Sequence, residues 1–258
     1  MENVERLEDP SPEELRELAQ RLRERGETHM SVEIDEGDER AFSTLERVGF
    51  RPVARLLTVE LEVLERDLDR SPRGESFGSV HVQTDDLPAV ERTVRRFVPL
   101  LPGKSKGSVI VPPRNGWISV YDELCDRDPS ALPRVARELS DGLGLVVTQF
   151  AVEEGAVGRY RIYERGRMLD EYLSVPEYYG PLPSGEVVAL AANPTLVERL
   201  TGGARRGVRE AAVQAPSPDE LPPPNEIVTA LASAMGIEGA EHGYARARDV
   251  PGAMVIDR

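Results

Sequence analysis

The sequence predicts an α+β protein, on three observations. Stretches with apolar residues at helical spacing alternate with stretches in which every second residue is apolar. Hydrophobic residues make up 40% of the 258 residues and charged residues 30%, which is enough apolar material for a core. A polar segment rich in proline and glycine, residues 67–78, separates a short first part from a longer second part.

We therefore expect two folded parts of different architecture. Residues 1–68 should form a partial α/β half-domain, and residues 69–78 should form a linker. Residues 79–258 should form an α+β sandwich, in which helices cover one face of an antiparallel or mixed sheet and C-terminal helices follow.

The first helix of the chain is marked by its N-terminal residues. Ser11 can cap it and Pro12 suits the first helical position, and leucines recur behind them at helical spacing until a glycine ends the helix. Alternating apolar residues then predict a strand over 28–35, and an amphipathic helix is expected over 39–48. Another strand is expected over 53–64, which completes the first part.

The longer part begins with segments that suggest a single sheet. Strands are expected over 79–84, 108–112, 116–124, 146–154 and 158–174, and helices over 87–101 and 128–144. The dipeptides Asn115-Gly116 and Glu154-Gly155 predict hairpin turns between neighbouring strands.

The C-terminal third is expected to be helical. Residues 193–215 have helical spacing and begin with the capping residue Asn193. A proline-rich connector follows, and a short apolar helix from residue 225 should end at Gly236.

Charge and composition exclude several classes of protein. The formal net charge of −14 disfavours general binding to nucleic acids and to anionic membranes, because both are polyanions. The charge is uneven, since residues 1–75 hold 21 acids and 12 bases, a net of −9. No apolar run approaches the roughly 18 residues of a membrane helix, and the acidic N-terminus lacks a signal-peptide pattern.

Cysteine and lysine are both rare in the chain. Cys125 is the only cysteine, which excludes an internal disulfide and fits a reducing compartment, so we expect a cytoplasmic protein. Its simplest role is that of a small hydrophobic residue at the end of a strand. Lys104 and Lys106 are the only lysines, and we interpret the excess of arginine as a compositional bias.

The first part also carries a recognisable motif. Its first helix ends in Arg-Glu-Arg-Gly, a strand follows, and the next helix has the spaced residues Asp38, Ala41, Leu45, Gly49 and Phe50. Residues 11–65 thereby resemble the C-terminal half of the GNAT (GCN5-related) N-acetyltransferases, over about a quarter of the chain. The resemblance implies half of an acetyltransferase fold, whose exposed sheet edge must be covered by the rest of the chain or by a partner. A homodimer built across that edge is one hypothesis.

Two departures from the family pattern argue against acetyl transfer. The family holds the acetyl-CoA pyrophosphate on the backbone amides of a glycine-containing loop before the first of these helices. Residues 7–14 lack glycine, contain two prolines that remove amide donors, and carry four carboxylates that repel a diphosphate. Leu45 stands where the family usually has a proton-donating tyrosine, and leucine donates no proton. We therefore expect no cofactor.

A second string mimics the cofactor loop of the family. Arg199, Gly202 and Ala204 fit the form R-x-x-G-x-A, but the residues before them have helical spacing, whereas the family loop follows a strand. We interpret the string as a glycine-containing helix stop. Three nearby arginines leave an anion site as the alternative.

Two clusters in the longer part have both a structural and a functional interpretation. His81 is followed by Asp85 and Asp86, and the simplest explanation is a strand histidine followed by a helix-capping aspartate. Trp117 and Tyr121 share one face of a strand, which is either part of the core or the floor of a binding groove.

A third cluster is a loop rich in tyrosine and carboxylate between prolines, residues 168–186. It is either the rim of a ligand or protein site or a loop packed on the sheet by its tyrosines. Neighbouring strand residues point to opposite faces, so neither Asp122/Glu123 nor Asp170/Glu171 forms a dyad by itself. No catalytic residue or metal ligand is assigned, and the candidate ligand-binding residues are Trp117, Tyr121, Asp170, Glu171, Tyr172, Tyr178 and Tyr179.

The sequence favours a non-catalytic, GNAT-derived cytoplasmic protein whose α+β domain binds a ligand or a protein partner. One alternative is a diverged acyl-CoA-dependent N-acyltransferase, the only case in which acetyl-CoA is expected. The other is an unclassified enzyme that uses the tyrosine and carboxylate loop at 170–179.

Overall fold

The chain divides into two compact units. A computed structural model describes residues 4–6, 12–26, 29–33, 51–53, 56–60, 74–101 and 103–257. One unit contains residues 1–71, and the other contains residues 72–258 except for 179–181. The helix expected over 39–48, and with it Leu45, lies outside the described residues.

Where the smaller unit is described, it contains a four-stranded sheet and the helix α1 (Pro12–Glu24). The strands follow the order β1 (Val4–Arg6), β2 (His29–Glu33), β4 (Leu56–Glu60) and β3 (Arg51–Val53). The pair β1–β2 is parallel, and the pairs β2–β4 and β3–β4 are antiparallel. The strand expected over 53–64 contains β4, but Val53 belongs to the separate strand β3, which pairs with β4. The apolar stripe of α1 is fully buried and consists of Leu15, Leu18, Ala19 and Leu22.

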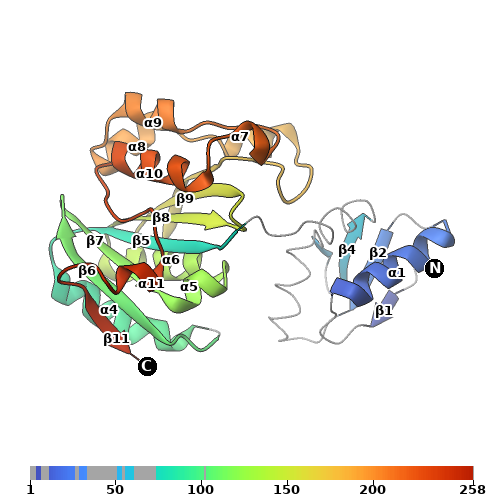
Figure 1. The fold of residues 1–258 in the computed structure, drawn as a ribbon, viewed down its shortest axis with the longest axis horizontal. Helices are drawn as coiled ribbons and strands as arrows, with labels where there is room; N and C mark the ends of the chain where they lie inside the picture. The colour runs from blue at the N-terminus through green and yellow to red at the C-terminus, as the bar shows by residue number, and fades with distance from the viewer. Residues whose placement is uncertain are drawn as a thin grey trace. The chain divides into compact units, whose positions relative to one another are not determined.

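The larger unit is built on a seven-stranded antiparallel sheet, which confirms the α+β class (Figure 1). Its spatial order is β10-β9-β8-β5-β7-β6-β11. The strands are β5 (Phe77–Gln83), β6 (Gly107–Arg114), β7 (Trp117–Asp122), β8 (Val146–Glu153), β9 (Val157–Glu164), β10 (Arg167–Leu173) and β11 (Met254–Asp257).

Three hairpins of this sheet have a turn in which a non-glycine residue is followed by a glycine, and both residues have positive φ. The predicted turns at Asn115-Gly116 and Glu154-Gly155 are confirmed, with φ of 53° and 78° in the first and 54° and 62° in the second. A third turn at Arg165-Gly166 divides the strand expected over 158–174 into β9 and β10. Such turns suit hairpins because their twist matches that of the paired strands.

One face of the sheet is covered by α4 (Leu87–Phe97) and α6 (Ala131–Leu143). The short helix η1 (Val98–Leu100) continues α4, and α5 (Glu123–Arg127) follows β7 directly. Cys125 consequently lies in a helix and is buried, not at a strand end as expected. The alternating valines of β5 pack against the apolar stripes of α4 and α6.

The C-terminal helices cover the opposite face, so helices lie on both faces, whereas the sequence placed them on one (Figure 1). The covering helices are α8 (Pro194–Thr201), α9 (Arg205–Ala211), α10 (Pro224–Ala234) and α11 (Tyr244–Ala247), with the short helix η2 (Pro218–Glu220) before α10. Helix α7 (Ser184–Ala189) precedes them and has no buried residue. The apolar face of α10 packs on β8 and β9. Among the described helices, none is both long and apolar enough to cross a membrane.

A matched pair of leucine substitutions tests the assignment of the core. Leu139 is 1% exposed in α6, and Leu100 is 73% exposed in η1. Leu139→Ala should lower the free energy of unfolding by about 2–5 kcal/mol, because it leaves a cavity in the core. Leu100→Ala should change it by less than about 0.5 kcal/mol. Urea unfolding followed by the fluorescence of Trp117 measures both, and equal losses would contradict the described packing.

Candidate functional site

The predicted aromatic strand face lies in the core. Trp117 is buried beneath the C-terminal helices, next to residues of α8 and α10. Tyr121 is buried as well, and its hydroxyl donates a hydrogen bond to the carbonyl oxygen of Gly239 at 2.7 Å. Burial raises the pKa of Tyr121 above its usual value, so the phenol stays protonated. Both residues thus form part of the covered sheet face.

His81 is fully buried on the central strand β5 and has a partner for each ring nitrogen. Its Nδ1 lies 2.9 Å from the hydroxyl of Ser119, and its Nε2 lies 2.9 Å from the hydroxyl of Ser79. Burial, together with the nearby His242, lowers the pKa of His81 to about 3, so the imidazole is neutral.

The aspartates that follow His81 serve the next helix. Asp86 caps α4 by accepting a hydrogen bond from the backbone amide of Ala89 at 3.0 Å. Neither Asp85 nor Asp86 binds His81, whose two partners are serines. The histidine and its aspartates therefore do not form a catalytic pair.

A segment between α10 and α11, residues 237–243, covers this histidine and its serines. The hydroxyl of Ser119 donates to the carbonyl of Glu238 at 3.4 Å, and the ring of His242 stacks on Tyr121 with centroids 5.2 Å apart. Gly239 has φ of 86°, and a side chain there would collide with the Tyr121 hydroxyl. The segment thus requires glycine at 239 in order to lie this close to the sheet.

The carboxylate of Asp170 is used in a buried hydrogen-bond network beneath the C-terminal helices. It accepts hydrogen bonds from the Tyr160 hydroxyl at 2.7 Å and from the Asn193 amide at 3.2 Å. Burial raises the pKa of the Asp170 carboxyl. The neighbouring Tyr172 is fully buried and donates its hydroxyl hydrogen to the carbonyl of Val213.

Glu171 points to the opposite face from Asp170, as the strand alternation predicted. It forms ion pairs of 2.7 Å with both Arg159 and Arg161. Arg159 also pairs with Glu153 at 2.9 Å, which joins strands β8, β9 and β10 across the sheet.

The two tyrosines at the end of the loop are placed elsewhere. Tyr178 donates to the carboxylate of Glu154 at 2.8 Å, at the turn between β8 and β9. Tyr179 is half-buried. Because Asp170, Glu171 and Tyr178 bind three different sets of partners, the loop residues do not converge on one point.

The string that mimics a cofactor loop is preceded by a helix. Arg199 lies in the last turn of α8, and Gly202 ends that helix in the left-handed conformation with φ of 73°. Gly203 packs against the backbone of Ala234 and Met235 so closely that a side chain would collide with it. Ala204 then precedes α9, a helix of 7 residues.

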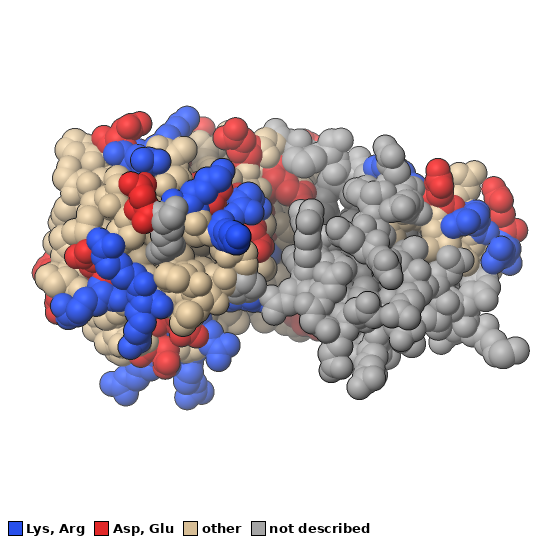
Figure 2. All heavy atoms as spheres, turned by 90° about the horizontal axis from the view of Figure 1, so that it is seen from below, with Lys and Arg blue, Asp and Glu red and all other residues tan. Residues whose placement is uncertain are grey.

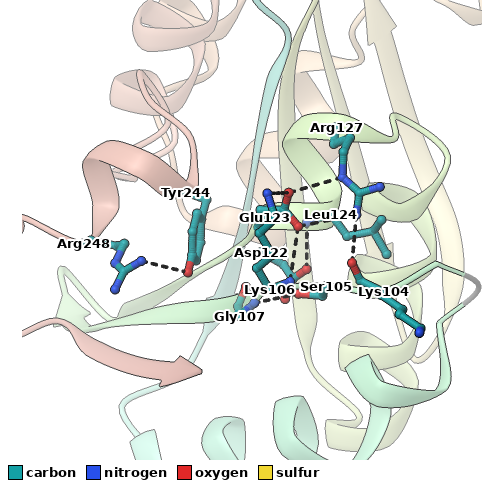
Figure 3. Close-up of polar contacts among 10 residues, drawn as sticks. All are labelled: Lys104, Ser105, Lys106, Gly107, Asp122, Glu123, Leu124, Arg127, Tyr244 and Arg248. Atoms are coloured by element: carbon teal, nitrogen blue, oxygen red, sulfur yellow. Dashed lines mark hydrogen bonds and ion pairs between the residues drawn. The ribbon is translucent and has the colours of Figure 1, made fainter. Parts of the chain in front are cut away.

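A corner between β6 and α5 holds a polar network that sequence reasoning did not identify (Figure 3). Asp122 caps α5 through the amide of Leu124 at 3.0 Å and accepts the Ser108 hydroxyl at 2.5 Å. Glu123 pairs with Arg127 at 3.2 Å and with the ammonium of Lys106 at 3.6 Å. Arg127 in turn donates to the carbonyl of Lys104 at 2.8 Å. The network therefore fixes the loop that carries the only two lysines.

Asp126 connects three elements beside this corner. Its carboxylate accepts hydrogen bonds from the amides of Gly78 at 3.1 Å and Tyr244 at 2.8 Å, which belong to β5 and α11. Burial raises the pKa of Asp126 to about 6, against the effect of these two amides. The adjacent Cys125 is a buried thiol whose pKa burial raises well above its usual range, so it is a poor nucleophile.

Cations gather on the surface that runs from α4 to this corner. We define the basic face as Arg92, Arg95, Arg96, Lys104, Lys106 and Arg127, all exposed. The view from the side of α4 shows several lysine and arginine side chains grouped there (Figure 2). Two features of the sequence could have predicted this face. The helix over 87–101 has its arginines on one side, and the only lysines are residues 104 and 106.

The comparisons with known proteins found no match. No family model matches the chain, and neither a curated protein nor a solved structure matches it. Within the described ranges, no group of three or more His, Cys, Asp or Glu side chains is placed to hold a metal ion.

The buried neutral histidine predicts a specific pH dependence. A group whose pKa is lower in the folded than in the unfolded state loses stability as the pH falls below its unfolded value, about 6.5 for histidine. Between pH 7 and pH 5, His81 should therefore reduce the free energy of unfolding by about 2 kcal/mol. Asp126 acts in the opposite direction, because its raised pKa removes stability as the pH rises towards 6.

A comparison with His81→Gln isolates this contribution, since the variant retains Asp126 and the other histidines. Urea unfolding at pH 7 and pH 5 should show a loss about 2 kcal/mol larger in the unmodified protein than in the variant. Equal losses in the two proteins would mean that His81 titrates normally in the folded state.

Proposed function

We propose that the chain is a non-catalytic, protein-binding member of the GNAT lineage, in which the smaller unit is a scaffold. The observation that carries this proposal is the use of the chemically capable residues in the larger unit. His81, Tyr121 and Asp170 are buried, and each is hydrogen-bonded to its own protein partners. A catalytic site needs such groups to converge on a substrate atom within hydrogen-bond reach.

The order of elements in the smaller unit supports the GNAT part of the proposal. A strand, β1, leads into α1, and α1 leads into β2, which pairs with β1 in parallel. Helix α1 ends at the arginines of the Arg-Glu-Arg-Gly motif, and antiparallel strands complete the sheet. This is the helix, strand and final-strand order that the resemblance implies.

The sequence between β1 and α1 supports the loss of acetyl-CoA binding. Residues 7–14 span the place where the family loop would hold the pyrophosphate, and they contain four carboxylates and two prolines. At 4 Å and an effective dielectric of about 20, each like-charge pair costs about 4 kcal/mol before screening. That is as large as the whole binding free energy of a millimolar ligand, about 4.1 kcal/mol.

The sheet edge of the smaller unit supports a binding role. Within the described residues, β1 lies at the edge of its sheet, so its outer backbone groups have no strand partner there. An unpaired edge is a template for strand addition from another chain. A homodimer or a protein partner that pairs with β1 is the contact that we propose for this unit.

Isothermal titration of the full chain with acetyl-CoA and with CoA, at low salt, tests the non-catalytic assignment. We expect no saturable heat up to millimolar ligand, because residues 7–14 repel the diphosphate. Neutralising Glu8, Asp9, Glu13 and Glu14 to their amides provides the matched control, and it should increase any residual binding. Saturable micromolar binding to the unmodified chain would overturn the proposal and favour the diverged N-acyltransferase.

A further inference from the structure

We infer that the basic face binds an acidic segment of a partner protein, with Leu100 as the apolar contact at its centre. This inference rests on the proposed protein-binding function and adds to it a location and a partner chemistry. It concerns the larger unit and does not depend on the edge strand β1.

The basic face has an excess of positive charge. The six cations of the basic face are accompanied by two carboxylates with which they pair, Glu91 and Glu123. These eight side chains sum to +4, whereas the residues after 75 together carry a net charge of −5, from 25 acids and 20 bases. A concentrated patch of opposite sign attracts a complementary surface and orients it as it approaches.

The cations of the basic face differ in whether a carboxylate of the same chain pairs with them. Arg95 pairs with Glu91 on the same helix, and Arg127 is fixed between Glu123 and the Lys104 carbonyl. Arg92 and Arg96 have no ion pair with any described residue, although both are exposed on α4. Guanidinium groups present a planar pair of donors that suits a carboxylate, so these two are the natural partners for Asp or Glu of another chain.

Leu100 is an exposed apolar side chain in the segment that joins α4 to the corner. It is 73% exposed in η1, between Arg96 at the end of α4 and Lys104 at the corner. The adjacent Leu101 is buried in the core with Leu124, which holds this stretch against α5. An exposed leucine with a cation four residues before it and another four residues after it along the chain matches a partner segment that carries carboxylates on both sides of an apolar residue.

The net negative charge favours a short acidic peptide over a nucleic acid or an anionic membrane as the partner of the basic face. A nucleic acid or an anionic membrane extends well beyond the basic face and would meet the net negative charge of the larger unit, which is −5 because 25 acids and 20 bases follow residue 75. A short acidic peptide segment needs to contact the basic face alone. The observations therefore favour a protein partner.

Fluorescence anisotropy tests the inference with a labelled twelve-residue peptide of Glu, Asp and a central Leu, at low salt. The control peptide has Gln and Asn in place of the acids. We expect saturable binding of the acidic peptide only, weakened at least tenfold by Arg92→Glu with Arg96→Glu, and weakened by Leu100→Ala. Arg206→Glu is the matched control, because Arg206 is 90% exposed on α9, and it should change binding less than twofold.

The two lysines allow the contact to be located by chemistry. Carbodiimide joins a lysine amine to a carboxylate in direct contact, and apart from the chain terminus the only amines are those of Lys104 and Lys106. Coupling of the acidic peptide should occur at these residues and disappear in Lys104→Arg with Lys106→Arg, which keeps the charge and should keep the affinity.

Three results would overturn the inference: no saturable binding of the acidic peptide, equal weakening by Arg206→Glu, or coupling that persists without the lysines. Tighter binding of a single-stranded 20-nucleotide DNA or of phosphatidylserine vesicles through the same arginines would also overturn it. Circular dichroism confirms that each variant is folded. Failure here leaves the coenzyme A titration unaffected, so the two proposals are tested separately.

Discussion

The larger unit depends on polar side chains that are buried on one face of its central strand. β5 has strands on either side and helices on either face, so His81 and Ser79 are removed from water. A buried polar group without a hydrogen bond costs about 1–3 kcal/mol, and a buried charged imidazole costs more. Ser79 and Ser119 provide a hydrogen-bond partner for each ring nitrogen of a neutral His81. The carbonyl of Glu238 accepts a hydrogen bond from Ser119, and that of Gly239 accepts one from Tyr121.

This arrangement explains why residues with catalytic potential serve structure here. The strand face that carries Tyr121, His81 and Tyr160 is closed by α10, α11 and the segment 237–243. The polar side-chain atoms of these three residues are already hydrogen-bonded to other groups of the protein. The basic face lies on the surface and contrasts with the negative net charge of the chain.

Local sequence patterns predicted much of the secondary structure. The caps at Asp86 and Asn193 and the turns at Asn115-Gly116 and Glu154-Gly155 depend on residues that are neighbours in sequence. The turn at Arg165-Gly166 was missed because arginine seldom adopts positive φ. β11 was missed because its four residues are specified by pairing with β6, about 145 positions earlier in the chain.

Prediction of the site residues was limited in the same way, because local patterns do not reveal contacts between segments that are distant in the sequence. Alternation correctly placed Trp117 and Tyr121 on one face and separated Asp170 from Glu171, but it could not show that the C-terminal segment covers the aromatic face. An apolar stripe shows that a helix is packed and not which sheet face it packs on, so helices on both faces were not foreseen. The basic face was overlooked because the net charge averages over the chain, whereas the helix geometry of α4 concentrates its arginines on one side.

The structural role of His81 is tested most directly by nitrogen-15 NMR of the histidine side chains across a pH titration. The chain contains three histidines, so His29→Gln and His242→Gln assign the signals. We predict that His81 stays neutral, with one fixed tautomer, from pH 7.5 down to below pH 5. A His81 signal that titrates with a midpoint near 6.5, or that shows averaged tautomers, would contradict a buried histidine held between two serines.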